Sequence, residues 1–229
     1  MLADVRHGKG QTLDKVKLGK GQALEKEMAL LHKKQNALIF TSGYIANHSS
    51  IIALAKIIHD LVVFSDQKNH ASIINGVKHS GLKKHVFKHN DMNHLEELLK
   101  QHDLEEPKII IFESIYSMDG DFGDIAGIVK LAKKYNALTY IDEVHGVGLY
   151  GEDGSGFAGK LGLSDKIDII QGTFGKAYGG IGGYIASSNE IIDAVRSFAP
   201  GFIFTTALPP MVAASIHSNV KHSQNNSRI

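Results

Sequence analysis

The sequence contains no cysteine, no tryptophan and only four prolines in 229 residues. The absence of cysteine excludes a disulfide framework, cysteine-ligated zinc and thiol catalysis, and it fits a reducing compartment. No apolar run approaches the roughly 18–20 residues that a membrane-spanning helix needs. Residues 1–22 also lack the apolar stretch of a secretion signal. These absences predict a globular protein of one or two domains without a membrane span.

An excess of charge of one sign is missing as well. Lysine and arginine number 25 and aspartate and glutamate 24, which leaves a net charge of +1. This balance gives no support for a surface that binds nucleic acid or anionic lipid. The 13 histidines are scattered, without ligand spacing beside a carboxylate on one helix face. We therefore expect no metal site and no nucleic-acid partner.

The two ends of the chain differ from its middle. An imperfect repeat, G-K-G-Q-T-L-D-K and then G-K-G-Q-A-L-E-K, occupies Gly8–Lys15 and Gly19–Lys26. Two copies are too few for a solenoid, and the second copy runs into a segment with apolar residues at helical spacing. The last residues, from His222, are polar and are expected to fray. We predict an atypical arm over residues 1–22, one large domain over 23–210 and a short polar tail over 211–229.

Strand-like and helix-like segments alternate between these ends. The strand-like runs are Leu61–Ser65, Lys84–Lys88, Lys108–Glu113, Leu138–Asp142, Ile167–Gln171 and Gly183–Ala186. The helix-like segments include Ala46–Ile58, Ala71–Ser80, Asp91–Gln101 and Asp124–Tyr135, with aspartates at the cap positions of the last two. Strands rich in isoleucine and valine, without alternating polar residues, are buried on both faces. The pattern predicts an α/β fold of three layers, with a mainly parallel sheet between two layers of helices.

Polar residues collect directly after the predicted strands. In a parallel sheet, ligands bind beyond the carboxyl ends of the strands. Upstream, T-S-G-Y precedes a predicted helix, whose first amide groups could hold a phosphate. The residues that follow the strands include Ser65, Asp66, Asn69, His70, Glu113, Ser114, Tyr116, Ser117, Asp142, Glu143, His145, Thr173 and Lys176.

Lys176 is unusual among these residues, because only small or aromatic residues accompany it in G-T-F-G-K-A-Y-G-G. Such neighbours leave room for a ring and predict a poorly solvated amine. An aspartate, a histidine, a lysine and a phosphate-binding helix start at one sheet edge together suit pyridoxal phosphate. Lys176 would form a Schiff base with the aldehyde, and Asp142 would keep the pyridine nitrogen protonated. His70 is suited to stacking on the ring, and Ser117 and His145 to hydrogen bonds with its phenolic oxygen.

Each residue taken alone also has an ordinary interpretation. A lysine after a strand is usually a solvated loop residue, and D-E-V-H is often only a strand end with its caps. The segment G-T-F-G-K-A does not meet the P-loop pattern, which needs four residues between the glycines and a hydroxyl after the lysine. No G-x-G-x-x-G segment joins a strand to a helix, which argues against a dinucleotide site. The order and spacing of all the motifs together favour the pyridoxal phosphate interpretation.

Five segments resemble the α-oxoamine synthases, which are fold-type I pyridoxal-phosphate enzymes that condense an amino acid with an acyl-CoA. They are T-S-G-Y-I-A-N, S-D-Q-K-N-H-A-S-I-I-N-G, F-E-S-I-Y-S-M-D-G-D, Y-I-D-E-V-H-G-V-G-L-Y-G and G-T-F-G-K-A-Y-G. They occur in the family's order between Ala23 and about Leu208. The resemblance implies the pyridoxal-phosphate-binding large domain of a fold-type I transferase.

Two further segments resemble the branch of this family that joins glycine to succinyl-CoA and forms 5-aminolevulinate for haem and porphyrin synthesis, with loss of CO2 and CoA. They are V-F-K-H-N-D-M-N-H-L-E-E-L-L and S-F-A-P-G-F-I-F-T-T-A-L-P-P. The resemblance implies that Lys176 also removes a glycine α-proton, and that a homodimer shares its active sites. It also implies cofactor contacts from Gly43, Tyr44, His70, Ser117, Asp142, His145 and Thr173, contacts from Thr205 and Thr206 to the neighbouring subunit's cofactor phosphate, and acyl-CoA contacts from Ser65 and Lys84.

The sequence departs from this branch in several places. It has G-T-F-G-K-A-Y-G where the branch has G-T-L-A-K-A-F-G, and D-E-V-H-G where the branch has D-E-V-H-A. These variants resemble sister enzymes of the 2-amino-3-ketobutyrate CoA ligase or 8-amino-7-oxononanoate synthase type, which stay as alternatives. The family's upstream arginine segment and its small C-terminal domain, with the arginine that grips the amino-acid carboxylate, have no counterpart. We expect weak or absent turnover from the isolated chain, a cofactor-binding chain without turnover as a further alternative, and a bacterial cytoplasm rather than a mitochondrial matrix.

Overall fold

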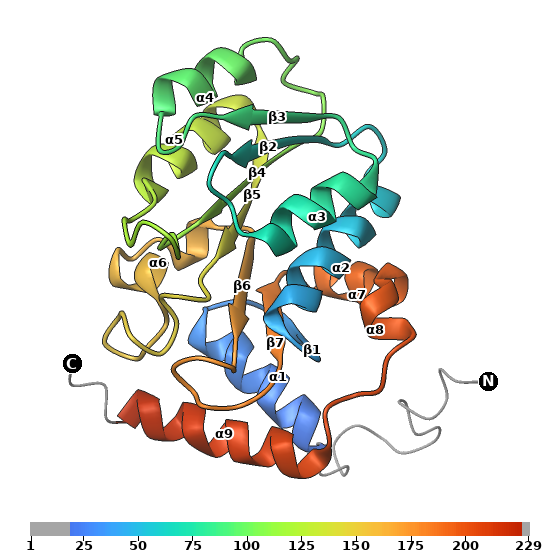
Figure 1. Ribbon diagram of the computed structural model, residues 1–229, viewed down its shortest axis with the longest axis vertical. Coiled ribbons are helices and arrows are strands. Elements are labelled where there is room, and N and C mark those ends of the chain that lie inside the picture. The colour runs from blue at the N-terminus through green and yellow to red at the C-terminus, as the bar shows by residue number, and fades with distance from the viewer. Residues whose placement is uncertain (1–18, 226–229) are drawn as a thin grey trace.

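The computed structural model describes residues 19–225, and its centre is a sheet of seven strands (Figure 1). The strands lie in the order β1-β7-β6-β5-β4-β2-β3. Neighbours from β6 to β3 pair in parallel, and β7 is antiparallel to both β6 and β1. The mainly parallel sheet that the sequence predicts is therefore confirmed. The strands are β1 (Asn36–Phe40), β2 (Val62–Asp66), β3 (Lys84–Phe87), β4 (Lys108–Glu113), β5 (Ala137–Asp142), β6 (Ile169–Thr173) and β7 (Gly183–Ser187).

Helices cover both faces of the sheet, as the three-layer prediction requires (Figure 1). The first layer consists of α2 (Gly43–Ile57), α3 (Ala71–Ser80), α7 (Asn189–Phe198) and α8 (Pro200–Ile203). The second consists of α1 (Lys20–Leu31), α4 (Met92–Leu99), α5 (Ile125–Tyr135), α6 (Phe157–Lys160) and α9 (Pro210–Asn225), with a 3-10 turn at Ser164–Lys166. Within residues 19–225, none of these helices is long and apolar enough to cross a membrane.

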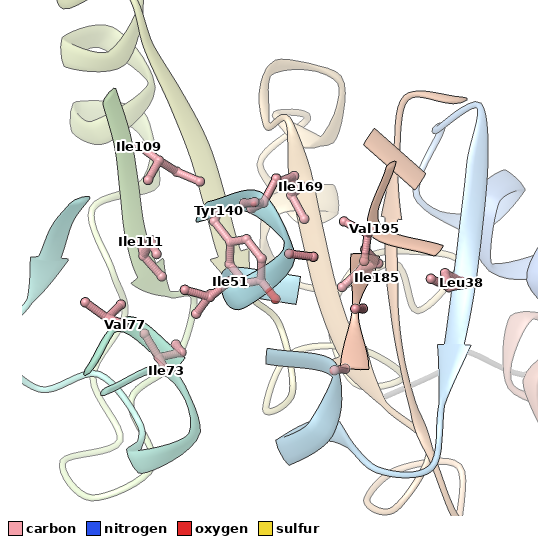
Figure 2. Close-up of a cluster of buried hydrophobic side chains, with 14 of the residues drawn as sticks. Leu38, Ile51, Ile73, Val77, Ile109, Ile111, Tyr140, Ile169, Ile185 and Val195 are labelled. Atoms are coloured by element: carbon pink, nitrogen blue, oxygen red, sulfur yellow. The ribbon is translucent and has the colours of Figure 1, made fainter. Parts of the chain in front are cut away.

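Alternate residues of the strands pack into different helical layers. Figure 2 shows the core beneath α2 and α3, where Ile109 and Ile111 of β4 and Tyr140 of β5 point towards Ile51 and Ile73. The intervening residues of the same strands pack on the opposite face, against α4 and α5. Burial on both faces explains why these strands read as continuous apolar runs. Because helices pack on both faces of these strands, the carboxyl ends of the strands are held in fixed positions as well.

Several predicted elements have shifted ends, and the shifts have local causes. The helix expected from Ala46 begins three residues earlier, because the Ser42 hydroxyl accepts the N–H of Ile45 and caps the helix at that point. The strand expected over residues 167–171 begins at Ile169, since Asp168 bonds instead to the Thr139 side chain. No strand was predicted at 36–40, where β1 forms the edge of the sheet beside β7.

The chain from Pro210 to Asn225, which includes most of the predicted tail, is helical. It forms α9, which packs along α1 (Figure 1). Ala213, Ile216 and Val220 recur at helical spacing and are buried, and the polar residues between them masked this stripe. The predicted arm also overlaps α1, which begins at Lys20. Residues 1–18, with the first repeat copy, and residues 226–229 lie outside the described part of the chain, so the division into arm, domain and tail stays a prediction.

The start of α2 is placed by direct backbone contact with β7. A Cβ added to Gly183 would lie 2.5 Å from both the N and the Cα atoms of Gly43. A side chain at residue 183 would therefore separate the first turn of α2 from the sheet. Glycine at residue 183 sets the distance between the helix start and the ends of β6 and β7.

We expect Gly183→Ala to lower the free energy of unfolding by about 1–3 kcal/mol, because the added methyl meets backbone atoms that cannot rotate away. Chemical denaturation of the two proteins measures the difference. Gly21→Ala is the matched control, since nothing lies within 4 Å of its added Cβ and alanine favours helix α1 by up to about 1 kcal/mol. Equal effects of the two substitutions would contradict this packing.

Candidate active site

A cleft of about 170 Å3 opens at the carboxyl ends of the parallel strands. Strands β4, β5 and β6 end in Glu113, Asp142 and Thr173, and all three side chains line the cleft. The structure thus confirms that the strand ends meet at one place, as the parallel sheet requires. Seven of the predicted site residues line it, namely Gly43, Tyr44, His70, Asp142, His145, Thr173 and Lys176.

Lys176 lies in the loop between β6 and β7, and hydrogen bonds within the loop fix its path. The Thr173 hydroxyl donates to the carbonyl of Gly182 at 3.0 Å, and the N–H of Gly180 donates to the carbonyl of Phe174 at 2.7 Å. The Lys176 carbonyl accepts the N–H of Gly179 at 3.0 Å. The side chain of Lys176 is exposed at the cleft. The expectation of a poorly solvated amine was therefore wrong, because the small neighbours leave open space instead of burying it.

A buried chain of hydrogen bonds joins Asp142 to His70 through Asn47 of α2. The Asn47 amide donates to Asp142 Oδ2 at 2.7 Å and to Ser72 Oγ at 3.0 Å. Its carbonyl oxygen accepts from Tyr140 Oη at 2.9 Å, so both amide hydrogens and the oxygen have partners. The Ser72 Oγ and His70 Nδ1 atoms are 2.7 Å apart. Because Nδ1 also accepts the Ser72 N–H at 3.2 Å, the neutral form of the His70 ring carries its N–H on Nε2.

Burial raises the pKa of Asp142, and the N–H of Val144, the Asn47 amide and the charges of His70 and Lys176 oppose this rise. The same groups stabilise the ionised form of the carboxyl group. For His145, burial followed by the charges of Lys176 and His70 lowers the pKa of the imidazole. His145 is accordingly neutral near pH 7 and has one nitrogen free to accept a hydrogen bond.

The first turn of α2 presents unpaired amide groups to the cleft. The first hydrogen bonds of this helix come from the N–H groups of Ile45 and Ala46, both to Ser42. In the described part of the chain, the N–H groups of Gly43 and Tyr44 have no acceptor. Free amides and the positive end of the helix dipole favour an anionic group at this position.

Five predicted residues lie away from the cleft lining. Ser117 is exposed in the loop after β4, and Ser65 is buried and accepts the Asn69 amide at 2.9 Å. Lys84 is the first residue of β3, at the end of the strand opposite the cleft edge. Thr205 and Thr206 line a separate groove of about 830 Å3 bounded by α1, α7 and α8. Their assigned contacts with acyl-CoA or a second subunit stay predictions.

Four cleft residues were not assigned a role in the sequence analysis, namely Asn47, Ser72, Glu113 and Val144. All four stand inside quoted motifs, namely T-S-G-Y-I-A-N, S-D-Q-K-N-H-A-S-I-I-N-G, F-E-S-I-Y-S-M-D-G-D and Y-I-D-E-V-H-G-V-G-L-Y-G. Asn47 follows Gly43 by four residues, which places both on one face of α2. That spacing was a usable signal, whereas the contact between Asn47 and Asp142 depends on how α2 packs across β5.

We expect Asn47→Ala to lower the free energy of unfolding by about 2–3 kcal/mol, because it leaves Tyr140 Oη without its acceptor and Asp142 without one donor. Thermal or urea unfolding measures this loss. Asn75→Ala is the matched control, since the amide of Asn75 bonds only to the exposed Tyr44 Oη, and we expect a change within about 0.5 kcal/mol. A small effect at Asn47 would mean that the buried chain does not stabilise the site.

Comparisons with known proteins agree with this geometry. The family model for aminotransferase class I and II matches residues 3–229. The 5-aminolevulinate synthase of Rickettsia felis is 59% identical over 199 residues, which cover 87% of this chain and 48% of that protein. The enzyme of the same name from Paracoccus denitrificans is 55% identical over 197 residues, covering 86% and 48%. The chain spans about half the length of the curated relatives that it matches.

Solved structures give the same result for the fold. A serine palmitoyltransferase from S. paucimobilis with bound PLP–myriocin aldimine matches with a TM-score of 0.85 and 30% identity, over 97% of this chain and 56% of that one. The 8-amino-7-oxononanoate synthase from Francisella tularensis matches with a TM-score of 0.77 and 28% identity, over 97% and 62%. The resemblance to the α-oxoamine synthases is thereby confirmed, and the chain belongs to the aminotransferase class I and II family.

Proposed function

We propose that this chain binds pyridoxal 5'-phosphate in the cleft and contributes to the condensation of glycine with succinyl-CoA to 5-aminolevulinate, CO2 and CoA. The observation that carries the proposal is the convergence of Lys176, Asp142 and His70 on one cleft at the strand ends. The identity of 59% with a 5-aminolevulinate synthase supports the choice of reaction. The activity belongs to the whole protein, because the chain spans about half of such relatives.

The residues of the cleft fit this cofactor. The unpaired amides of Gly43 and Tyr44 match its phosphate, and Asp142 is a carboxylate with donors already on both oxygens. Such a carboxylate suits a protonated ring nitrogen. The exposed amine of Lys176 matches the aldehyde, and the His70 ring lies at the cleft with its tautomer fixed.

When bound, pyridoxal phosphate supplies an acceptor for the electron pair of a substrate carbanion. The chain's own residues do the rest. Asp142 would keep the ring nitrogen protonated through its negative charge, and His70 would stack on the ring and exclude water from it. Lys176 Nζ would hold the aldehyde as a Schiff base with loss of water and, once the glycine amine has displaced it, would be free to accept the glycine α-proton. Neutral His145 accepts or donates a hydrogen bond at the phenolic oxygen, and we assign Ser117 and Thr173 to the same cofactor.

The partners are further parts of the proposal. Thr205 and Thr206 lie away from this chain's own cleft, which is compatible with their reaching the cofactor phosphate of a second copy in a homodimer. Ser65 and Lys84 are assigned to the acyl-CoA. The relatives come from bacteria such as Rickettsia and Paracoccus, and we place this protein in the bacterial cytoplasm.

A product assay tests the proposed reaction. The protein is given pyridoxal phosphate, glycine and, in turn, succinyl-CoA, acetyl-CoA and longer acyl-CoA molecules, and the amino ketone products are identified by mass spectrometry. We expect turnover by this chain to be weak or absent, and we expect any product to be 5-aminolevulinate, formed from succinyl-CoA. Product from acetyl-CoA alone would instead indicate a 2-amino-3-ketobutyrate CoA ligase type, and product from a long acyl chain would contradict the 5-aminolevulinate assignment in the same way.

A further inference from the structure

The cleft contains two buried carboxyl groups side by side, and the proposed function uses only one of them. Glu113 and Asp142 are the last residues of β4 and β5 and are paired in the register of these strands. They are 2% and 4% exposed, and both line the cleft. Two adjacent buried carboxyl groups do not both ionise readily, because each negative charge raises the cost of the other. One proton is therefore shared between them near neutral pH.

The hydrogen-bond donors around the pair are distributed unequally. Asp142 accepts the Asn47 amide at 2.7 Å and the N–H of Val144 at 2.9 Å, one on each oxygen. Glu113 accepts a single donor, the backbone N–H of His70, at 2.5 Å on Oε1. Its Oε2 atom has no hydrogen-bond partner among residues 19–225. Donors on both oxygens stabilise a carboxylate, so the ionised form belongs to Asp142.

We propose that Glu113 is a positioning residue that carries the one proton of the Glu113–Asp142 pair. The proton lies on Oε2, while Oε1 holds His70 in place through its backbone N–H. The cleft then presents a single negative charge, on Asp142, to a cationic ring nitrogen. The role given to the charge on Asp142 rests on the proposed function, because it requires the cofactor in this cleft. The protonation of Glu113 is a property of the chain alone.

The other titratable groups around Glu113 are consistent with a retained proton. Burial and then the charge of Asp142 raise the pKa of Glu113 to about 8. The N–H of His70 lowers this pKa, and the charge of Asp66 raises it further. Lys176 and His70 act on Asp142 in the opposite direction and favour its ionised form. The other titratable groups that face Glu113 or Asp142 are Asp66 from β2, His70 at the start of α3, Tyr116 after β4, Glu143 and His145 after β5, and Lys176 after β6.

Carboxyl NMR measures the proton directly. The full chain is labelled with 13C at the glutamate δ-carbons, without cofactor, and each signal is followed with pH. Burial also raises the pKa of Glu143, to about 7, so the signal of Glu113 is identified by substitution. We expect a signal with a midpoint of about 8 that is missing in Glu113→Gln and present in Glu143→Gln. In Asp142→Asn we expect this midpoint to fall by about one unit or more, because the neighbouring charge is gone. If no signal with a raised midpoint is lost in Glu113→Gln, or if its midpoint is unchanged in Asp142→Asn, the inference is overturned.

Cofactor binding gives the second readout. In Glu113→Gln the amide oxygen can still accept the His70 N–H, and the amide group replaces the neutral O–H. In Glu113→Ala both are lost. We expect Glu113→Ala to bind pyridoxal phosphate about tenfold more weakly than Glu113→Gln, which corresponds to one lost hydrogen bond of the usual strength. Equal binding by the two variants would show that Glu113 does not position His70.

The two proposals fail in different ways. If the wild-type chain binds no pyridoxal phosphate at any pH, the proposed function fails, and the NMR titration still decides whether Glu113 carries the proton. If the cofactor binds but the proton is found on Asp142, labelled in the same way at its γ-carbon, this inference fails and the proposed function stands. Circular dichroism of each variant separates these results from a loss of folding.

Discussion

Lys176→Ala is expected to abolish the covalent attachment of pyridoxal phosphate and to lower any product formation by about 10³-fold or more. The substitution removes both the amine that binds the aldehyde and the base for the α-proton, and general bases alone contribute about 10²–10⁴-fold. The visible absorbance band that wild-type protein gains with the cofactor should be missing. Because Lys176 is exposed in a loop held by backbone hydrogen bonds, the fold should persist.

The control for this result is another exposed lysine. Lys166 pairs with Asp165 at 2.8 Å in a turn at the opposite end of β6, so Lys166→Ala should keep the absorbance band. Unfolding curves of both variants should match that of the wild type within about 0.5 kcal/mol. A persistent band in Lys176→Ala with the same wavelength would mean that another amine binds the cofactor.

Asp142→Asn is expected to weaken the binding of pyridoxal phosphate by about 10²–10³-fold. The substitution removes a buried negative charge whose two oxygens are already oriented by Asn47 and Val144, and loss of one partner from a buried ion pair costs about 3–5 kcal/mol. The new amide also points its N–H groups at one of these donors. Equilibrium titration of the cofactor, followed by absorbance, measures the change.

Glu143→Gln provides a matched control, because it removes a buried carboxyl group from the next residue along the chain. The Glu143 carboxyl group accepts from Ser114 Oγ at 2.7 Å and from the N–H groups of Phe157 and Ala158, and it does not line the cleft. Glu143→Gln should lower stability but leave cofactor affinity within about twofold. If both substitutions weaken binding equally, the effect belongs to charge near the strand ends in general and not to Asp142.

Much of this site could be predicted from the sequence because it depends on chain order. Strands without alternating polar residues imply a parallel sheet, and a parallel sheet brings the residues after each strand to one edge. His70, Asp142, Thr173 and Lys176 follow three different strands and meet for that reason alone. The N-caps Ser42 and Asp124 also depend only on local sequence. The sequence analysis predicts the cap at Asp124 but not the one at Ser42.

The remaining features depend on packing between elements, which a single sequence does not display. The buried chain from Tyr140 through Asn47 to Ser72 requires α2 to cross β5 at one depth, and the glycine contact at Gly183 sets that depth. The sequence places Glu113 at the end of a strand, but only the pairing of β4 with β5 shows that it lies beside Asp142. The sequence did not predict helix α9, because its buried face consists of only three apolar residues, Ala213, Ile216 and Val220, with polar residues between them.

Reduction with borohydride tests the central claim most directly. The full chain is incubated with pyridoxal phosphate, reduced so that any link between the cofactor and an amine becomes permanent, digested and analysed by mass spectrometry. The site described above predicts one modified peptide, with the cofactor on Lys176. A cofactor attached to a different lysine, or no modified peptide at a saturating concentration, would contradict the assignment of this cleft.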